Sequence, residues 1–152
     1  MIILKIGGSV ITNKTKKDSF KQKIMDNLAK EIKKAEKEII LVHGAGSFGH
    51  ILAKKYDLNK GYIRKNQING FSFTHASVQS LNSLVLNCLH KNGVPAVSIS
   101  PHTMLKLANH KLFDINYKIF EDYLDKRFVP VTFGDVVLDK KLGFSICSGD
   151  LL

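Results

Sequence analysis

Short apolar runs alternate along this chain with longer segments in which apolar residues recur every three or four positions. The runs are rich in Ile, Leu and Val and occupy residues 2–6, 38–43, 94–100 and 128–133. Continuous runs of this kind are typical of strands that are buried on both faces of a parallel sheet. The alternation of such strands with helices predicts an α/β fold with a mainly parallel sheet.

The periodic segments predict helices of different lengths. In residues 20–37 the apolar positions share one face, at Ile24, Leu28, Ile32 and Ala35. A similar pattern from Phe71 to His90 predicts a long helix, which Asn92-Gly93 ends as a C-cap. Shorter helices are expected at residues 51–56, 101–108 and 116–126, with a loop over residues 57–67.

The last third of the chain carries a hairpin signal. Val136–Leu138 and Phe144–Ile146 flank the turn-forming sequence of residues 139–143, which predicts two antiparallel strands. No internal repeat, low-complexity tract or linker interrupts the chain. We therefore expect residues 1–152 to form a single domain.

A glycine-rich turn after the second apolar run is the most informative motif. It reads His43-Gly44-Ala45-Gly46-Ser47-Phe48-Gly49-His50 and precedes the helix predicted at residues 51–56. Backbone N–H groups at the start of a helix bind anions, so this turn predicts a phosphate site. His50 follows Gly46 by about one helical turn, and helical side chains lean toward the N-terminus, so we expect it to meet the anion. For His43 a structural role and a site role are equally compatible with the sequence.

A second motif follows the first strand. It reads Lys5-Ile6-Gly7-Gly8-Ser9, and Lys14 comes shortly after it. A lysine ammonium next to free backbone N–H groups suits a polyphosphate, and Lys14 would reach the same pocket if its loop folds back. A plain tight turn is the alternative for Gly7-Gly8.

Two further segments complete the candidate site. In Ser148-Gly149-Asp150 the carboxylate would orient the lysines and separate their charges, although an ordinary turn fits the sequence equally well. Most of the apolar face of the long helix is expected to be core. Its first turn could line a small apolar pocket beside the phosphate site, with Phe71, Phe73, Thr74 and His75.

Charge and composition reduce the number of functional classes to which the protein could belong. The net charge of +10 favours an anionic partner, while the lysines of residues 30–37 are expected to be a solvated helix face. No apolar run is long enough for a membrane span, and residues 1–12 lack the pattern of a signal peptide. Cys88 and Cys147 have no metal or redox spacing, which predicts two core thiols in a reducing cytoplasm. No catalytic triad, zinc-type spacing or Walker motif is present.

These motifs together resemble the amino acid kinase superfamily, from Met1 to Leu152. The resemblance rests on Lys5–Thr12, Lys14, residues 43–50, Pro130-Val131 with Gly134–Val137, and Ser148–Asp150. Within the superfamily the chain most resembles the archaeal-type isopentenyl phosphate kinases. The second histidine of the glycine-rich turn, His50, separates members that phosphorylate a phosphate from those that phosphorylate a carboxylate.

The resemblance implies an open αβα sandwich and the ATP-dependent phosphorylation of isopentenyl phosphate to isopentenyl diphosphate, a step of isoprenoid biosynthesis. Mg²⁺ is expected from this chemistry, and a homodimer from the resemblance. The groups facing the ATP phosphates would be Lys5, Gly7, Gly8, Ser9 and Gly46. Lys14 would stabilise the transition state and Asp150 would position the lysines. The acceptor phosphate would be held by Ala45, His50 and Gly149.

Family members are longer than this chain and continue into a segment that holds the adenine. The resemblance therefore implies that residues 1–152 are the acceptor-binding N-terminal part, without the nucleotide-binding C-terminal part, and leaves the activity of this part alone open. A kinase for a small phosphonate such as fosfomycin is the near alternative, since it could use the same histidine. A non-catalytic phosphate-binding fragment is another alternative. A nucleic-acid binder rests on charge alone, because no recognition helix is present.

Overall fold

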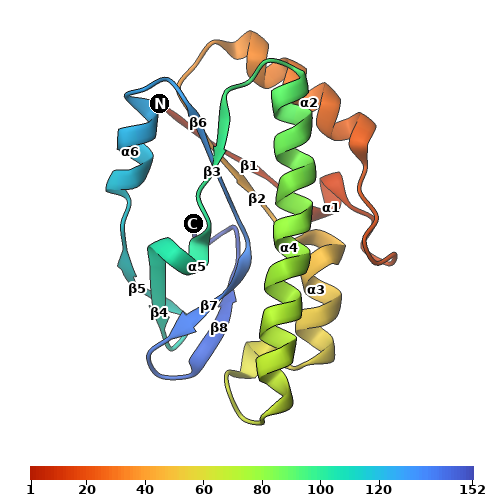
Figure 1. The fold of residues 1–152 in the computed structure, drawn as a ribbon, viewed down its shortest axis with the longest axis vertical. Helices are drawn as coiled ribbons and strands as arrows, with labels where there is room; N and C mark the ends of the chain where they lie inside the picture. Colours follow the sequence, from red (N-terminus) through yellow and green to blue (C-terminus); the bar gives the residue numbers. More distant parts are fainter.

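The computed structural model describes all residues from Met1 to Leu152 and shows an α/β fold with two sheets (Figure 1). The first sheet has the order β1-β2-β6-β3, and every neighbouring pair in it is parallel. Its strands are β1 (Ile2–Ile6), β2 (Ile39–His43), β6 (Val129–Phe133) and β3 (Ala96–Ser98). The α/β class predicted from the apolar runs is thus confirmed.

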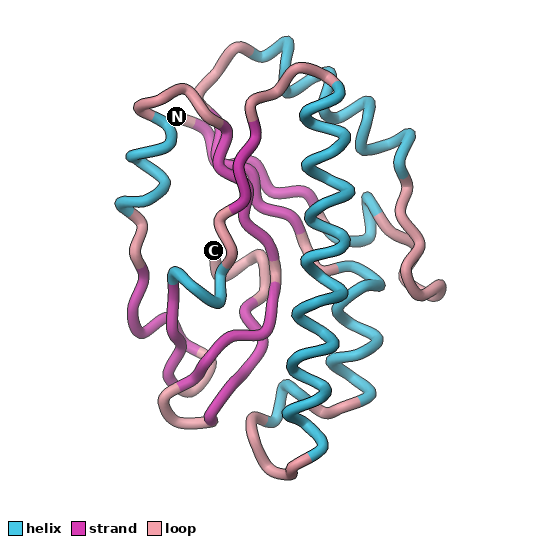
Figure 2. Tube along the Cα trace, in the orientation of Figure 1, coloured by secondary structure: helices cyan, strands magenta, loops and turns pink.

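Helices lie on both sides of this sheet (Figure 2). On one side, α2 (Gln22–Ala35) and α4 (Asn66–Lys91) pack with the side chain of Leu41 in the largest apolar cluster. On the other side, Ile40 packs against the cluster that contains Phe120 of α6 (Lys118–Leu124). Adjacent residues of β2 thus serve opposite layers, as the alternation of side chains along a strand requires. None of the helices is long and apolar enough to span a membrane.

The second sheet is mixed rather than parallel. Its order is β5-β4-β7-β8, with antiparallel pairs at both edges and a parallel β4–β7 pair between them. Its strands are β4 (Leu105–Ala108), β5 (Lys111–Ile115), β7 (Asp135–Asp139) and β8 (Gly143–Cys147). The β7–β8 hairpin was predicted, and β5 was missed. Residues 105–108 were wrongly predicted as helix. Their strand structure depends on pairing with β5, which was not predicted, and with β7, which is distant in the sequence.

Other element boundaries differ from the sequence prediction by less. The helix expected from residue 51 is α3 (Gly46–Lys55), so the glycine turn itself is partly helical. The long helix begins at Asn66 rather than Phe71, after the short 3-10 turn η1 (Leu58–Lys60). The buried Gln67 anchors this earlier start, since its side-chain oxygen accepts hydrogen bonds from the backbone of Ile63 and Arg64. The helix predicted over 101–108 is confirmed only for α5 (Pro101–Met104).

The carboxylate of Asp139 holds two turns of the second sheet together. It accepts hydrogen bonds from the backbone N–H groups of Asn109 and His110 before β5 and of Lys141 and Leu142 before β8. Burial alone would raise the pKa of Asp139, but these backbone hydrogen bonds lower that pKa well below its ordinary value. The ionised carboxylate is therefore part of the folded structure.

We expect Asp139→Asn to lower the free energy of unfolding by about 2 kcal/mol or more near neutral pH, because an amide oxygen cannot replace a carboxylate with several donors. The folded-state pKa is depressed, so the stabilisation is complete above the unfolded pKa of about 4 and is lost as pH falls below it. Urea denaturation between pH 7 and pH 3 measures the difference. A stability gap between the two proteins that stays constant with pH would contradict this account.

Candidate active site

The glycine turns after β1 and β2 pack directly on each other, backbone to backbone. A Cβ atom on Gly8 would lie 2.4 Å from the Gly46 nitrogen, and one on Gly44 would lie 2.6 Å from the Gly8 nitrogen. Such distances exclude any side chain at these positions. The contact explains physically why glycines follow both parallel strands, since only glycine lets two backbones approach this closely.

Thr12 fastens the two turns. Its hydroxyl donates a hydrogen bond to the Gly8 carbonyl, at 2.7 Å, and accepts one from the Ser47 N–H, at 3.0 Å. Gly44 N–H also donates to the Ile6 carbonyl, at 3.0 Å. Thr12 ends the short helix α1 (Gly8–Ile11) and is buried. The start of α3 is therefore held in place by hydrogen bonds from the first turn.

Helix α3 presents its N-terminus and His50 on the same side. The backbone N–H groups of Ala45 and Gly46 have no hydrogen-bond partner within the chain, while that of Ser47 is taken by Thr12. His50 is exposed and lies one turn further along α3. It shares a cavity with Ala45, as the predicted lean of the side chain requires.

This cavity has a volume of about 150 Å³ and lies at the carboxyl ends of the parallel strands. Its polar wall comes from the turns and from α3, and consists of Lys5, Gly7, Gly8, Gly44, Ala45, His50, Ser148, Gly149 and Asp150. Its apolar wall comes from α3, α4 and the second sheet, and includes Ala53, Val78, Val136 and Ile146. A separate cavity of about 230 Å³ under α6 is lined almost entirely by apolar side chains and offers little to an anion.

Lys5 and Asp150 form an ion pair across the mouth of the cavity. The Lys5 ammonium contacts Asp150 Oδ1, which joins the end of β1 to the turn after β8. The side chains are 41% and 77% exposed, so the pair contributes little to stability. The contact is compatible with the predicted role of Asp150 in orienting a lysine, and that role stays a prediction. Lys5 is the lysine that Asp150 contacts, and Lys14 is not part of this pair.

Lys14, Ser9 and Gly46 do not line the cavity. Lys14 is exposed, in a loop that is closed by hydrogen bonds between Asn13 and Ser19. Ser9 is also exposed, and its carbonyl accepts a hydrogen bond from Lys21 Nζ at 3.0 Å. Gly46 is buried beneath Thr12. The predicted contacts of Ser9 and Gly46 with the ATP phosphates, and the predicted role of Lys14 in the transition state, stay predictions.

The structure brings Gly134 and Asp135 into the cavity wall, although these residues were expected only as part of the family motif and not in the site. A Cβ on Gly134 would lie 3.3 Å from the Ala45 nitrogen and 3.4 Å from the Gly149 nitrogen. The turn after β6 thus meets the turns after β2 and β8. A glycine directly after an apolar strand was the signal that could have found it.

The predicted apolar pocket at the start of α4 is only partly present. Thr74 and Val78 line the cavity, and the Thr74 hydroxyl is buried without a hydrogen-bond partner. Phe73 is 53% exposed and packs near Tyr56 on the outer surface, so it is not in the pocket. Phe71 packs against Phe144 instead.

Two titratable groups beside the cavity are held neutral. Burial lowers the pKa of His43, which is fully buried, stacks on Phe133 and lies 3.1 Å from Asn82 Oδ1. Burial also raises the pKa of the Cys147 thiol to about 12. His43 is therefore a structural residue, and Cys147 is not a nucleophile at neutral pH.

Fold and site together define an α/β protein that presents glycine turns and a helix N-terminus at the carboxyl ends of parallel strands. The family model described as the amino acid kinase family matches residues 1–152. The chain belongs to this family.

Named relatives agree with this assignment. The chain is 38% identical to the isopentenyl phosphate kinase of Methanothermobacter thermautotrophicus, over 100% of this chain and 60% of the relative. It is 36% identical to the isopentenyl phosphate kinase of Methanocaldococcus jannaschii, over 99% of this chain and 61% of the relative. The chain thus spans about three fifths of the length of the curated relatives it matches.

Solved structures give the same picture. An isopentenyl phosphate kinase structure matches with a TM-score of 0.92 at 36% identity, covering 98% of this chain and 63% of that one. A product complex of the Thermoplasma acidophilum isopentenyl phosphate kinase matches with a TM-score of 0.88 at 31% identity, covering 99% and 62%. An aspartate kinase at 15% identity, with a TM-score of 0.63, shares the fold.

We expect Gly8→Ala to lower the free energy of unfolding by about 2–3 kcal/mol, since the added methyl group must push two backbones apart. Gly7→Ala is the matched control, because the nearest atom to its Cβ would be 3.8 Å away and its backbone is extended. Urea denaturation of both variants of the intact protein measures the difference. Equal stability of the two variants would show that the turns can separate without cost.

Proposed function

We propose that the intact protein transfers the terminal phosphoryl group of ATP to isopentenyl phosphate and produces isopentenyl diphosphate and ADP. The observation that carries the proposal is the place of His50, one turn from the free amide of Ala45 and in the same cavity. A histidine and a backbone amide that converge in this way suit a phosphate acceptor. The names of the relatives support the same substrate.

The two walls of the cavity fit the two ends of such an acceptor. Its phosphate would meet Ala45, His50 and Gly149 on the polar wall, while its short hydrocarbon tail would lie toward Val78 and Ile146 on the apolar wall. Because the acceptor phosphate is itself the nucleophile, the reaction needs no strong general base. Alignment of the two phosphates and neutralisation of their charge supply most of the catalysis.

Lys5 is the cation best placed to offset the charge of the transferring group. It lies at the mouth beside the backbone of Gly7 and Gly8, and Asp150 orients it. ATP phosphates would therefore approach from this side of the cavity. Ser9, Gly46 and Lys14 are proposed to act there also, and contact with them requires the nucleotide to extend beyond the cavity described above.

ATP brings Mg²⁺ to the reaction, and this ion supplies further charge neutralisation on the phosphates. Mg²⁺ prefers oxygen ligands and is commonly held by one or two carboxylates together with phosphate oxygens and water. The exposed carboxylate of Asp150 at the mouth fits such a role. A homodimer and a cytoplasmic location are further parts of the proposal.

We expect His50→Ala to lower kcat/KM for isopentenyl phosphate by about 10²–10³-fold, because a donor to the acceptor phosphate is lost. The KM for ATP should change little. A coupled assay of ADP release by the intact protein measures both values. His110→Asn is the control, since His110 is an exposed residue of the β4–β5 turn whose positive φ asparagine tolerates.

Three results would contradict the proposal in distinguishable ways. Turnover of a phosphonate such as fosfomycin but not of isopentenyl phosphate would change the substrate. Calorimetric binding of isopentenyl phosphate without any ADP release would indicate a binding module. Full activity of His50→Ala would remove His50 from the acceptor site.

A further inference from the structure

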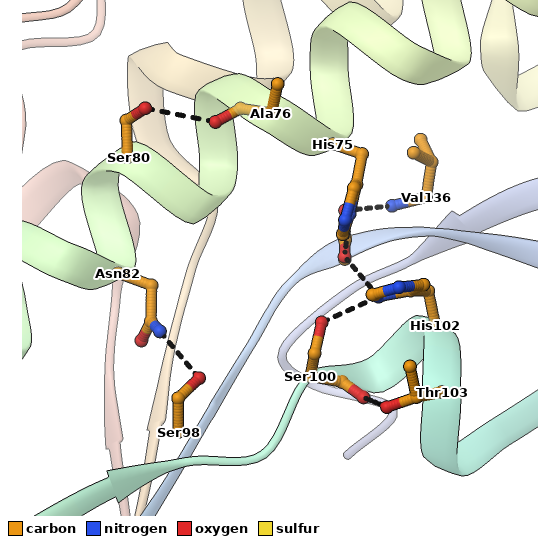
Figure 3. Close-up of polar contacts among 10 residues, drawn as sticks. His75, Ala76, Ser80, Asn82, Ser98, Ser100, His102, Thr103 and Val136 are labelled. Carbon is orange, nitrogen blue, oxygen red and sulfur yellow. Dashed lines mark hydrogen bonds and ion pairs between the residues drawn. The ribbon is translucent and has the colours of Figure 1, made fainter.

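Three metal-binding side chains meet beside the cavity, at a place that the proposed reaction does not use. His75 comes from α4, His102 from α5, and Asp135 is the first residue of β7. One potential ligand atom from each residue lies within 4.8 Å of the other two. Figure 3 shows the His75 and His102 side chains converging from opposite sides of the β6–β7 segment.

The contacts within the cluster are direct. His75 Nδ1 lies 2.7 Å from Asp135 Oδ2, and His102 Nδ1 lies 4.0 Å from the same oxygen. The two imidazole rings meet edge to face, with their centroids 4.1 Å apart. One carboxylate oxygen therefore faces two histidines from separate helices.

Neighbouring groups hold these side chains in position. Asp135 Oδ1 accepts a hydrogen bond from the Val136 N–H, at 2.8 Å, which turns Oδ2 toward the histidines. This hydrogen bond orients the carboxylate and leaves Oδ2 free for an ion, as is common at metal sites. Ser100 Oγ lies 2.7 Å from His102 Nδ1, the same nitrogen that faces Asp135, so this contact holds the ring in the absence of an ion and must be given up when an ion binds.

The burial of the cluster favours a cation. The Asp135 side chain is fully buried, whereas those of His75 and His102 are 18% and 33% exposed. A buried carboxylate needs compensating charge, and the partly exposed rings give an ion a way in from solvent.

The spacing fits an ion after small adjustments. Ligand atoms about 2.0–2.2 Å from a tetrahedral ion lie roughly 3.3–3.6 Å from one another. The observed distances to Asp135 Oδ2, 2.7 Å and 4.0 Å, fall on either side of that range. An ion would replace the His75–Asp135 hydrogen bond and the Ser100–His102 hydrogen bond, and would draw His102 Nδ1 inward by less than about 1 Å.

Two imidazoles and one carboxylate select the chemical class of the ion. This ligand set suits Zn²⁺ and its neighbours Co²⁺ and Ni²⁺, whereas Mg²⁺ and Ca²⁺ prefer oxygen ligands throughout. Three protein ligands leave a coordination position for water or an anion. Asp135 also lines the cavity, so this position would lie next to the acceptor site.

We propose that His75, His102 and Asp135 form a site for a divalent transition-metal ion that ties α4 and α5 to the start of β7. The proposal is independent of the proposed kinase reaction, because binding of the ion is measured without substrate. Bound ion stabilises the folded state by mass action, since the unfolded chain does not bring these residues together.

Titration of the intact, tag-free protein with Co²⁺ tests the site in the absence of nucleotide. We expect one Co²⁺ per chain with the visible absorption of a four-coordinate nitrogen and oxygen site. His102→Ala should weaken binding by about 100-fold or more, because loss of a ligand costs at least as much as loss of a group that orients one. His110→Asn, in which an exposed histidine is removed elsewhere, should bind as the unaltered protein does.

Thermal unfolding provides a second measurement on the same proteins. Zn²⁺ should raise the melting temperature of the unaltered protein and of His110→Asn, and should leave those of His102→Ala and Asp135→Asn unchanged. Failure of the unaltered protein to bind Co²⁺, or equal binding by His102→Ala, would overturn the proposal. Either result would show that the cluster serves only to form the hydrogen bond between His75 and Asp135.

Discussion

The close contact between two glycine turns is the constraint on which the rest of the site depends. Gly8 lies against Gly44 and Gly46 so tightly that a Cβ atom on either side would overlap backbone. This contact joins the carboxyl ends of β1 and β2, and Thr12 fixes it with two hydrogen bonds. This junction fixes the position of the N-terminus of α3. It thereby also fixes the position of His50, which lies one turn further along that helix.

Other parts of the fold complete the cavity around this junction. The turn after β6 approaches the same backbone through Gly134, and the turn after β8 brings Asp150 to Lys5. The second sheet closes the apolar side, and Asp139 keeps its two turns in place. The polar wall is therefore built mainly of turns at strand ends and the apolar wall of helix and strand side chains, which explains how one small space presents two chemistries.

Local pattern predicted much of this molecule. The parallel strands, α2 and the β7–β8 hairpin follow from apolar runs and helical spacing. Lys5, Ala45, His50, Gly149 and Asp150 line one cavity, but they were predicted as a group from the family resemblance as well as from glycine placement. Features that depend on distant pairing were not predictable. Residues 105–108 alternate apolar and polar side chains over too few positions to distinguish a strand from a helix, and their pairing with β5 and β7 decides their structure. The meeting of His75, His102 and Asp135 likewise depends on three elements that are far apart in the sequence.

Asp135 belongs to the wall of the cavity and also contacts His75. A metal ion that shifts this carboxylate at the proposed metal site would therefore change the free energy of binding at the proposed acceptor site. Thermodynamic linkage makes the effect reciprocal, so a metal ion that alters the affinity for the acceptor must have its own affinity altered by the same factor. The single carboxylate of Asp135 would thus couple the proposed metal site to the proposed acceptor site.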